Sequence, residues 1–286
     1  MNKTITTLLV AAGIAASAPA SAVIVGGVDF GALGADPNRT HLETATLAQT
    51  LVTGNGQTAR SYGFITTVNG DNTYCADGSG NCGLYYVGTF SNSQNYSPSY
   101  VEFTNSTVSV FFSNTSPFNL LDQNSPTNLA TIQALNGGNP WVTLTGHPNL
   151  GLHGEPPVMA DPSAVLNADG RFTGTTLSGA SFGLFDVSGP GDATVINFLN
   201  SNGVLDAVGN PTDIALTSSF NNNVLNPFDT GELTAGCGNG TAASGTWCFQ
   251  GTANLRGGTE VPEPGMLALV GIGLLGFGAA YRRRKA

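Results

Sequence analysis

Basic residues are scarce in this sequence. Nine Lys and Arg stand against 18 Asp and Glu, and the two lysines lie near the ends of the chain, at Lys3 and Lys285. Between residues 23 and 260 only four arginines remain against 17 acidic residues, which gives this stretch a net charge of −13. Such a charge repels the phosphates of nucleic acids and anionic lipid headgroups. We therefore expect no nucleic-acid partner.

Side chains that commonly carry catalysis are also few. The three histidines all precede Ser181, the centre of a Gly-x-Ser-x-Gly pattern, whereas hydrolases with that pattern place their histidine after the serine. His147, His153 and Glu155 share a Gly/Pro-rich loop and are weak candidates for a zinc or copper site. A carboxylate pair for glycoside hydrolysis stays open, because its separation depends on the fold. We expect no enzyme, no catalytic residue and no cofactor; the alternative is a secreted, polysaccharide-active enzyme.

Helical periodicity is nearly absent. Only Asn38 to Leu51 and Ser125 to Leu135 have the pattern of short helices. Elsewhere β-branched and aromatic runs alternate with turn signals rich in Gly, Asn, Pro and Ser. Many short strands and few helices predict an all-β protein with a single domain of the β-sandwich or jelly-roll type. The predicted strands lie at residues 61–68, 84–90, 100–103, 106–112, 141–145, 172–177, 181–187, 213–220 and 247–255.

The N-terminus has the pattern of a secretory signal peptide over residues 1–22. Lys3 supplies the positive charge, a short apolar run begins at Leu8, and Ala20-Ser21-Ala22 places small residues where signal peptidase cleaves. Pro19 argues against an ordinary amphipathic helix here. We expect export, with signal peptidase as a partner and a mature chain that starts near Val23.

The C-terminus combines an apolar segment with a cluster of positive charge. Residues 265–281 contain no charged side chain and span roughly 26 Å as a helix, at the short end of what crosses a bilayer. Arg282, Arg283, Arg284 and Lys285 follow, and such clusters stay on the cytoplasmic side. The pattern predicts a C-terminal transmembrane helix that ends at a basic stop and leaves residues 23–260 outside the membrane.

Pro262, Glu263 and Pro264 directly precede this segment. The motif, the apolar span and the basic end together make residues 261–286 resemble the PEP-CTERM sorting tail. The resemblance implies that an exosortase, a membrane cysteine peptidase, processes the chain. It also implies a precursor held in the inner membrane, then a protein at the cell surface or in the extracellular matrix.

The four cysteines form two local pairs, Cys75 with Cys82 and Cys237 with Cys248. An even number of cysteines in an exported chain predicts disulfides. Three connectivities are possible, and the two local bonds require the least chain closure. A zinc site is the alternative, but neither spacing is Cys-x-x-Cys and no histidine is near in the sequence.

Short motifs of residues 23–260 also resemble the flocculation-associated PEP-CTERM proteins (PepA type). These motifs are the cysteine hairpin of residues 62–82 and residues 141–147, 183–189, 214–220 and 251–257. The resemblance implies a structural or adhesive protein that supports flocculation or biofilm assembly together with exopolysaccharide, without enzymatic activity.

Overall fold

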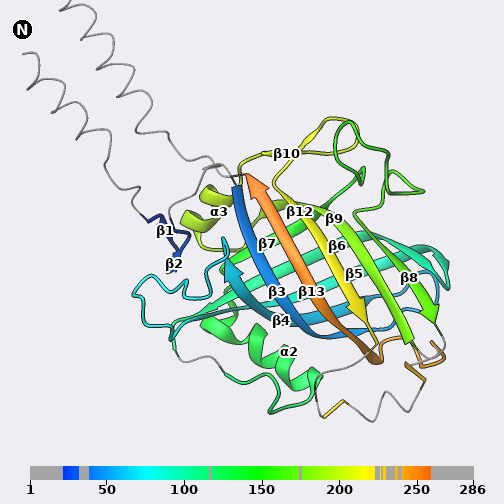
Figure 1. Cartoon of the computed structure of the whole chain (residues 1–286), viewed down its shortest axis with the longest axis horizontal. Coiled ribbons are helices and arrows are strands. Elements are labelled where there is room, and N and C mark those ends of the chain that lie inside the picture. The colour runs from blue at the N-terminus through cyan, green and yellow to red at the C-terminus, as the bar shows by residue number, and fades with distance from the viewer. Residues whose placement is uncertain are drawn as a thin grey trace, which may run out of the picture. The chain divides into compact units, whose positions relative to one another are not determined.

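The computed structural model describes residues 22–31, 39–115, 118–173, 176–222, 226, 228–229, 236–237 and 240–258. They lie in one compact unit of residues 22–260. Strands dominate it (Figure 1), and the elements in chain order are β1 (Ile24–Val25), β2 (Val28–Asp29), β3 (Arg39–Thr50), β4 (Ala59–Val68), β5 (Gly83–Ser97), β6 (Tyr100–Ser113), α2 (Ser125–Gln133), the 3₁₀ turn η1 (Leu135–Gly138), β7 (Val142–His147), β8 (Leu166–Thr173), β9 (Thr176–Ser188), α3 (Ala193–Leu199), β10 (Val204–Leu205), β11 (Pro211–Thr212), β12 (Ile214–Asn221) and β13 (Trp247–Gly258).

The main sheet closes on itself as a barrel of eight strands. Its antiparallel order runs β12-β13-β3-β4-β5-β6-β7-β9, and β9 also pairs with β12 over eight residue pairs, so both ends of the sheet are joined. In Figure 1 the layer of β3, β13, β12 and β9 crosses in front of β4, β5 and β6. The prediction of an all-β domain is confirmed. The expectation of a sandwich or jelly roll was wrong, since the sheet is a closed barrel. The sequence pattern could not separate these architectures, because inward and outward side chains alternate along the strands in both.

Strands β7 and β8 share one position in the barrel wall. Both lie between β6 and β9: β7 pairs with Thr107–Val110 of β6, and β8 pairs with Tyr100–Phe103 of the same strand. Residues 148–165 therefore form an excursion that interrupts a single line of strand. The chain leaves the wall after His147 and resumes it at Leu166.

Three local predictions were wrong. Residues 100–103 and 106–112, predicted as two strands, belong to the single strand β6. Within the segment predicted as a helix, Asn38 to Leu51, the residues Arg39–Thr50 form β3, which pairs with β4 on one side and β13 on the other. The run at 172–177 is not one strand: β8 ends at Thr173 and β9 begins at Thr176. The second predicted helix is confirmed as α2, where Asn124 caps the N-terminus by accepting a hydrogen bond from the Thr127 N–H.

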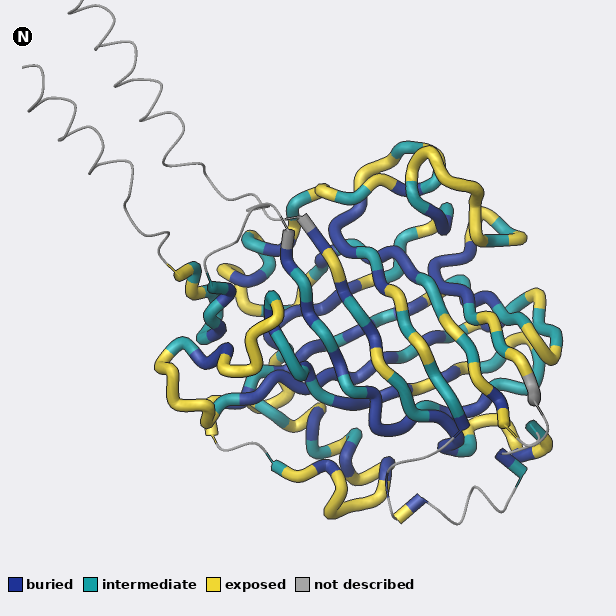
Figure 2. The backbone as a smooth tube through the Cα atoms, in the orientation of Figure 1, coloured by how far each residue is buried: buried dark blue, intermediate teal, exposed yellow. Residues whose placement is uncertain are grey.

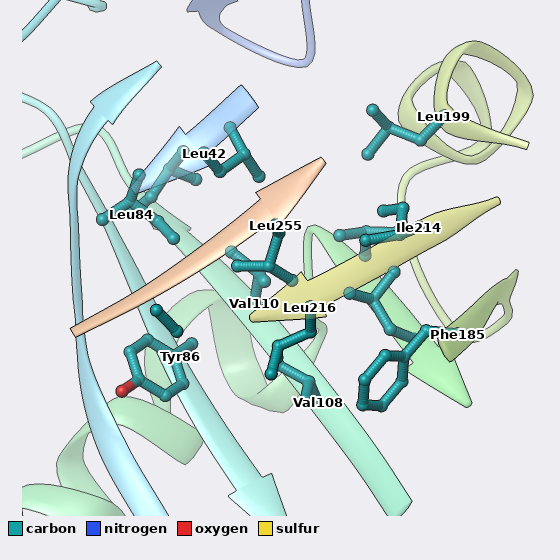
Figure 3. Close-up of a cluster of buried hydrophobic side chains, with 14 of the residues drawn as sticks. Leu42, Leu84, Tyr86, Val108, Val110, Phe185, Leu199, Ile214, Leu216 and Leu255 are labelled. Atoms are coloured by element: carbon teal, nitrogen blue, oxygen red, sulfur yellow. The ribbon is translucent and has the colours of Figure 1, made fainter. Parts of the chain in front are cut away.

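The interior of the barrel is apolar. Figure 3 shows side chains from opposite walls meeting there, with Tyr86 and Val110 on one side and Leu216 and Leu255 on the other. The helix α2 packs against a second apolar cluster on the outside of the barrel. This cluster contains Ile132 of α2 together with Tyr62 and Trp247. Burying large side chains of this kind contributes about 1.5–3 kcal/mol each.

The predicted membrane helix and basic stop (residues 265–285) lie outside the described residues, as does the signal peptide up to Ser21. No helix in the described part of the chain is long and apolar enough to cross a membrane.

Candidate functional site

The outer surface of the layer formed by β9, β12, β13, β3 and β4 is covered almost entirely by uncharged polar and small side chains. Cross-strand pairing sets them in rows, because Thr217 lies opposite both Phe182 and Asn254, and Ser219 lies opposite both Ala180 and Thr252. We call this surface the neutral face. Its residues are Ser178, Ala180, Phe182, Thr217, Ser219, Asn221, Gln250, Thr252, Asn254, Ala45 and Phe64.

This face is open to solvent. Thr217, Ser219 and Thr252 are exposed. Phe182 and Phe64 lie at the borders of the face and are half-buried, because Phe64 packs against the cluster that contains Ile132 of α2 and Phe182 packs against Leu184 and its neighbours. Figure 2 shows exposed and intermediate segments alternating with buried ones along these strands. The inward-facing neighbours belong to the barrel core, so the sheet presents hydroxyls and amides on a rigid support, with the partly exposed rings of Phe182 and Phe64 at its borders.

Hydrogen bonds between strands hold several of these groups in place. Ser219 and Thr252 share a hydrogen bond of 3.1 Å between their hydroxyl oxygens, and Gln250 donates from its amide to Asn221 at 3.3 Å. At the border of the face, the Asn254 amide oxygen lies 2.8 Å from His41 Nε2. A surface ordered in this way loses little side-chain entropy on binding.

Its chemistry matches that of an uncharged hydroxylated polymer. Hydroxyls and amides both donate and accept hydrogen bonds, and a partly exposed phenyl ring offers an apolar surface for stacking. Glu43 and Arg256 carry charge only at the edge of the face, where their strand neighbours are Asn254 and His41.

A different group of polar residues lies where the excursion of residues 148–165 leaves the wall. His147 Nδ1 lies 2.9 Å from the Asp186 carboxylate, and its Nε2 lies 3.3 Å from the carboxylate of Asp206, which is 0 % exposed. Burial raises the pKa of Asp206, but hydrogen bonds outweigh it. The donors are the Asn210 backbone and side chain, His147 and Asn149, and they lower the pKa to about 2. Asp206 thus anchors a turn and keeps the histidine in place.

Glu102 plays a similar part beneath the same excursion. The side chain is 0 % exposed, accepts a hydrogen bond of 2.6 Å from the Tyr100 hydroxyl and another of 2.6 Å from the Asn95 amide, and also accepts from the Ala160 N–H. Burial raises its pKa, and these donors together lower it below the ordinary value. The carboxylate therefore ties β6 to the excursion.

The weak metal candidates do not come together. His147 is held by its two carboxylates, whereas His153 lies beside Gly209, and Glu155 is an exposed loop residue. No group of three or more His, Cys, Asp or Glu side chains is arranged to hold a metal among the residues the structure describes.

Both predicted disulfides are confirmed. Cys75 joins Cys82 in the turn between β4 and β5, and Cys237 joins Cys248 at the start of β13. The local pairing therefore holds, and none of the four cysteines is free.

The C-terminal segment matches a known family description. Residues 260–285 fit the PEP-CTERM protein-sorting motif. The tail is a PEP-CTERM sorting signal. A chain with this signal is an exported substrate of exosortase whose precursor associates with the membrane. The match covers Pro262, Glu263, Pro264 and the basic stop, as predicted. No curated protein and no solved structure is significantly similar to the chain.

Sequence reasoning missed the neutral face and the buried acids. The only sequence signal for the face was its composition of Thr, Ser and Asn, which many secreted β proteins share. Nothing in the sequence indicated that Glu102 and Asp206 are buried. Their burial depends on the excursion of residues 148–165, and the closed barrel sets the position of that excursion.

Proposed function

We propose that this PEP-CTERM protein acts outside the cell as a structural, adhesive component that binds exopolysaccharide through the neutral face and supports flocculation or biofilm assembly. The observation that carries the proposal is the set of uncharged hydroxyl and amide rows across β9, β12 and β13. The PEP-CTERM sorting signal supports the proposal, because it implies that the chain is exported.

Binding without catalysis is supported by the state of the buried acids. Glu102, Asp206, Asp213 and Asp229 each accept hydrogen bonds from neighbouring protein groups. Saturated carboxylates of this kind are poor proton donors and acceptors for an incoming sugar. The alternative of a polysaccharide-active enzyme would need an accessible pair of acids with the right separation.

Weak single contacts suffice for this role. A net hydrogen bond contributes about 1 kcal/mol, so a few hydroxyl and amide contacts give low affinity for one chain segment. Many copies of the protein facing one long polymer add avidity, which can exceed the single affinity by about 10²–10⁴.

A pair of matched triple variants tests the proposal. Thr217→Ala, Thr252→Ala and Asn254→Ala together remove polar groups from the neutral face. Thr89→Ala, Thr107→Ala and Asn105→Ala remove the same residue types from β5 and β6, where Thr89 pairs with Thr107.

Each variant replaces the chromosomal gene in the producing bacterium. The measurements are sedimentation of flocs and the amount of polysaccharide retained with the cells. The first variant should match a deletion strain, and the second should match the wild type. Equal behaviour of the two triples would contradict the role of the face. If purified protein shortens the polysaccharide and loses that activity when one acid is replaced, the protein is an enzyme.

A further inference from the structure

A pocket of about 280 Å³ lies at one end of the barrel. It sits between the β5–β6 hairpin, the ends of β3 and β12 and the starts of β9 and β13. Aromatic side chains line much of it, namely Tyr96, Tyr100, Phe103, Phe220 and Phe249. Phe220 and Phe249 meet edge to face with their ring centres 5.5 Å apart. The pocket is separate from the neutral face, because Phe220 and Phe249 point inward from the strands whose outer side forms that face.

The pocket continues into the barrel. A smaller cavity of about 50 Å³ lies in the apolar core, and Gln49, Phe103 and Ala168 line both spaces. Eight-stranded barrels have an interior that side chains fill or that holds one small ligand. A cavity of roughly 150 Å³ lined by apolar side chains holds one benzene ring, so the outer pocket has room for about two fused rings and the inner one for none.

Among the residues that the structure describes, no Asp, Glu, Lys, Arg or His side chain lines either space. A charged ligand would lose its hydration there without gaining a partner, which costs several kcal/mol. An anion is disfavoured further by the Glu102 carboxylate, which accepts the hydrogen bond of the pocket residue Tyr100. The ligand should therefore be uncharged.

Two polar groups at the pocket are not used by the protein. Neither the Gln49 side-chain amide nor the Tyr96 hydroxyl has a hydrogen-bond partner among the residues the structure describes, and both side chains are half-buried. Gln49 lies where the outer pocket meets the inner cavity, and it can both donate to a ligand and accept from it.

We propose that this end of the barrel binds an uncharged, largely apolar small molecule of one or two fused rings, with a hydroxyl or amide group directed at Gln49. The apolar rings contact the aromatic wall, and the polar group replaces water on the unpaired amide. This is a function beyond adhesion, and it uses side chains on the inner side of the sheet.

Binding of 2-naphthol to the exported protein, followed by equilibrium dialysis at pH 7, tests the proposal. The ligand is neutral, has two fused rings and carries one hydroxyl. Its analogue 2-naphthalenesulfonate carries a fixed negative charge in place of the hydroxyl. We expect saturable binding of one naphthol per chain and at least tenfold weaker binding of the sulfonate. No saturable binding of naphthol, or equal binding of the two, would overturn the proposal.

A matched pair of variants locates the site. Ala168→Phe fills the junction of the two spaces from the inside of β8, whereas Ala180→Phe makes the same change on the exposed, outer side of β9. The first should weaken naphthol binding at least tenfold, and the second should leave it within twofold. Tyr96→Ala, at the rim, is the second pocket variant if Ala168→Phe does not fold.

Unchanged binding in a folded pocket variant would place the ligand elsewhere and overturn the assignment. Glucose and maltose serve as competitors. If they bind at the pocket and naphthol does not, the site belongs to a sugar and the assignment is wrong. The neutral-face triple variant should bind naphthol as the wild type does. The floc assay therefore tests only the adhesive role, and naphthol binding tests only the pocket.

Discussion

Removing the two disulfides one at a time should destabilise the protein by different amounts. The bonds join residues 7 and 11 positions apart. The loss of loop-closure entropy in the unfolded chain gives about 2.4 kcal/mol for Cys75–Cys82 and about 2.8 kcal/mol for Cys237–Cys248. On chain entropy alone the two bonds would be nearly equivalent.

The two disulfides differ in how deeply they are buried. Cys237 and Cys248 are both 0 % exposed and pack in a cluster with Leu51, Leu177 and Phe249, whereas Cys82 is only half-buried. Replacing the buried pair by alanine also removes two packed sulfur atoms, at a cost of about 1 kcal/mol each. We expect a loss of about 4–5 kcal/mol for Cys237→Ala with Cys248→Ala, and of about 2–3 kcal/mol for Cys75→Ala with Cys82→Ala.

The assay is urea unfolding of the purified exported protein, followed by circular dichroism, after non-reducing peptide mapping has identified the bonds. A third variant, Cys237→Ser with Cys248→Ser, places two hydroxyls in the apolar cluster and should lose about 1–3 kcal/mol more than the alanine pair. Equal losses for the two alanine pairs, or a larger loss for Cys75 with Cys82, would refute the reasoning.

Three further outcomes are expected. Because the pKa of Asp206 is lowered, the carboxylate stabilises the fold above about pH 4, and this contribution is lost as the pH falls towards about 2. Asp206→Asn should therefore lower the urea midpoint at pH 7 and make that midpoint less dependent on acid pH. An unchanged pH profile would contradict this. Gly63→Ala should destabilise the barrel by at least about 2 kcal/mol in thermal unfolding, because the added Cβ would lie 1.9 Å from the Ala45 carbonyl oxygen. The control Gly54→Ala places its Cβ 3.4 Å from the nearest atom, so its stability should stay within about 0.5 kcal/mol of the wild type. Deleting the exosortase gene should leave the full-length chain in the membrane fraction on immunoblots, and normal release of residues 23–260 in that strain would show that the tail only anchors.

Local features could be predicted because their physical causes lie within a few residues. The disulfides follow from two short spacings in an exported chain, and the helical pattern of Ser125 to Leu135 predicted α2, which the structure gives as Ser125–Gln133. Strand β4 was predicted almost to its ends, since alternation and the Asn69–Gly70 turn signal both act locally. The helix expected at residues 38–51 failed because pairing with β4 and β13 holds this segment as a strand, in which Leu42 packs in the barrel core and Leu47 in the outer cluster.

The sorting tail, the all-β class and the charge-poor, hydroxyl-rich composition could be predicted from the sequence alone. Only the tertiary structure decided that the sheet closes, because the pairing of β9 with β12 joins residues about 35 positions apart in the chain, and no local pattern specifies the partner of an edge strand. Closure places threonine and serine rows outside and Gln49 beside an aromatic pocket inside. Side chains alternate across each strand, so closure turns one set of them into the barrel interior and leaves the other set on its outer surface.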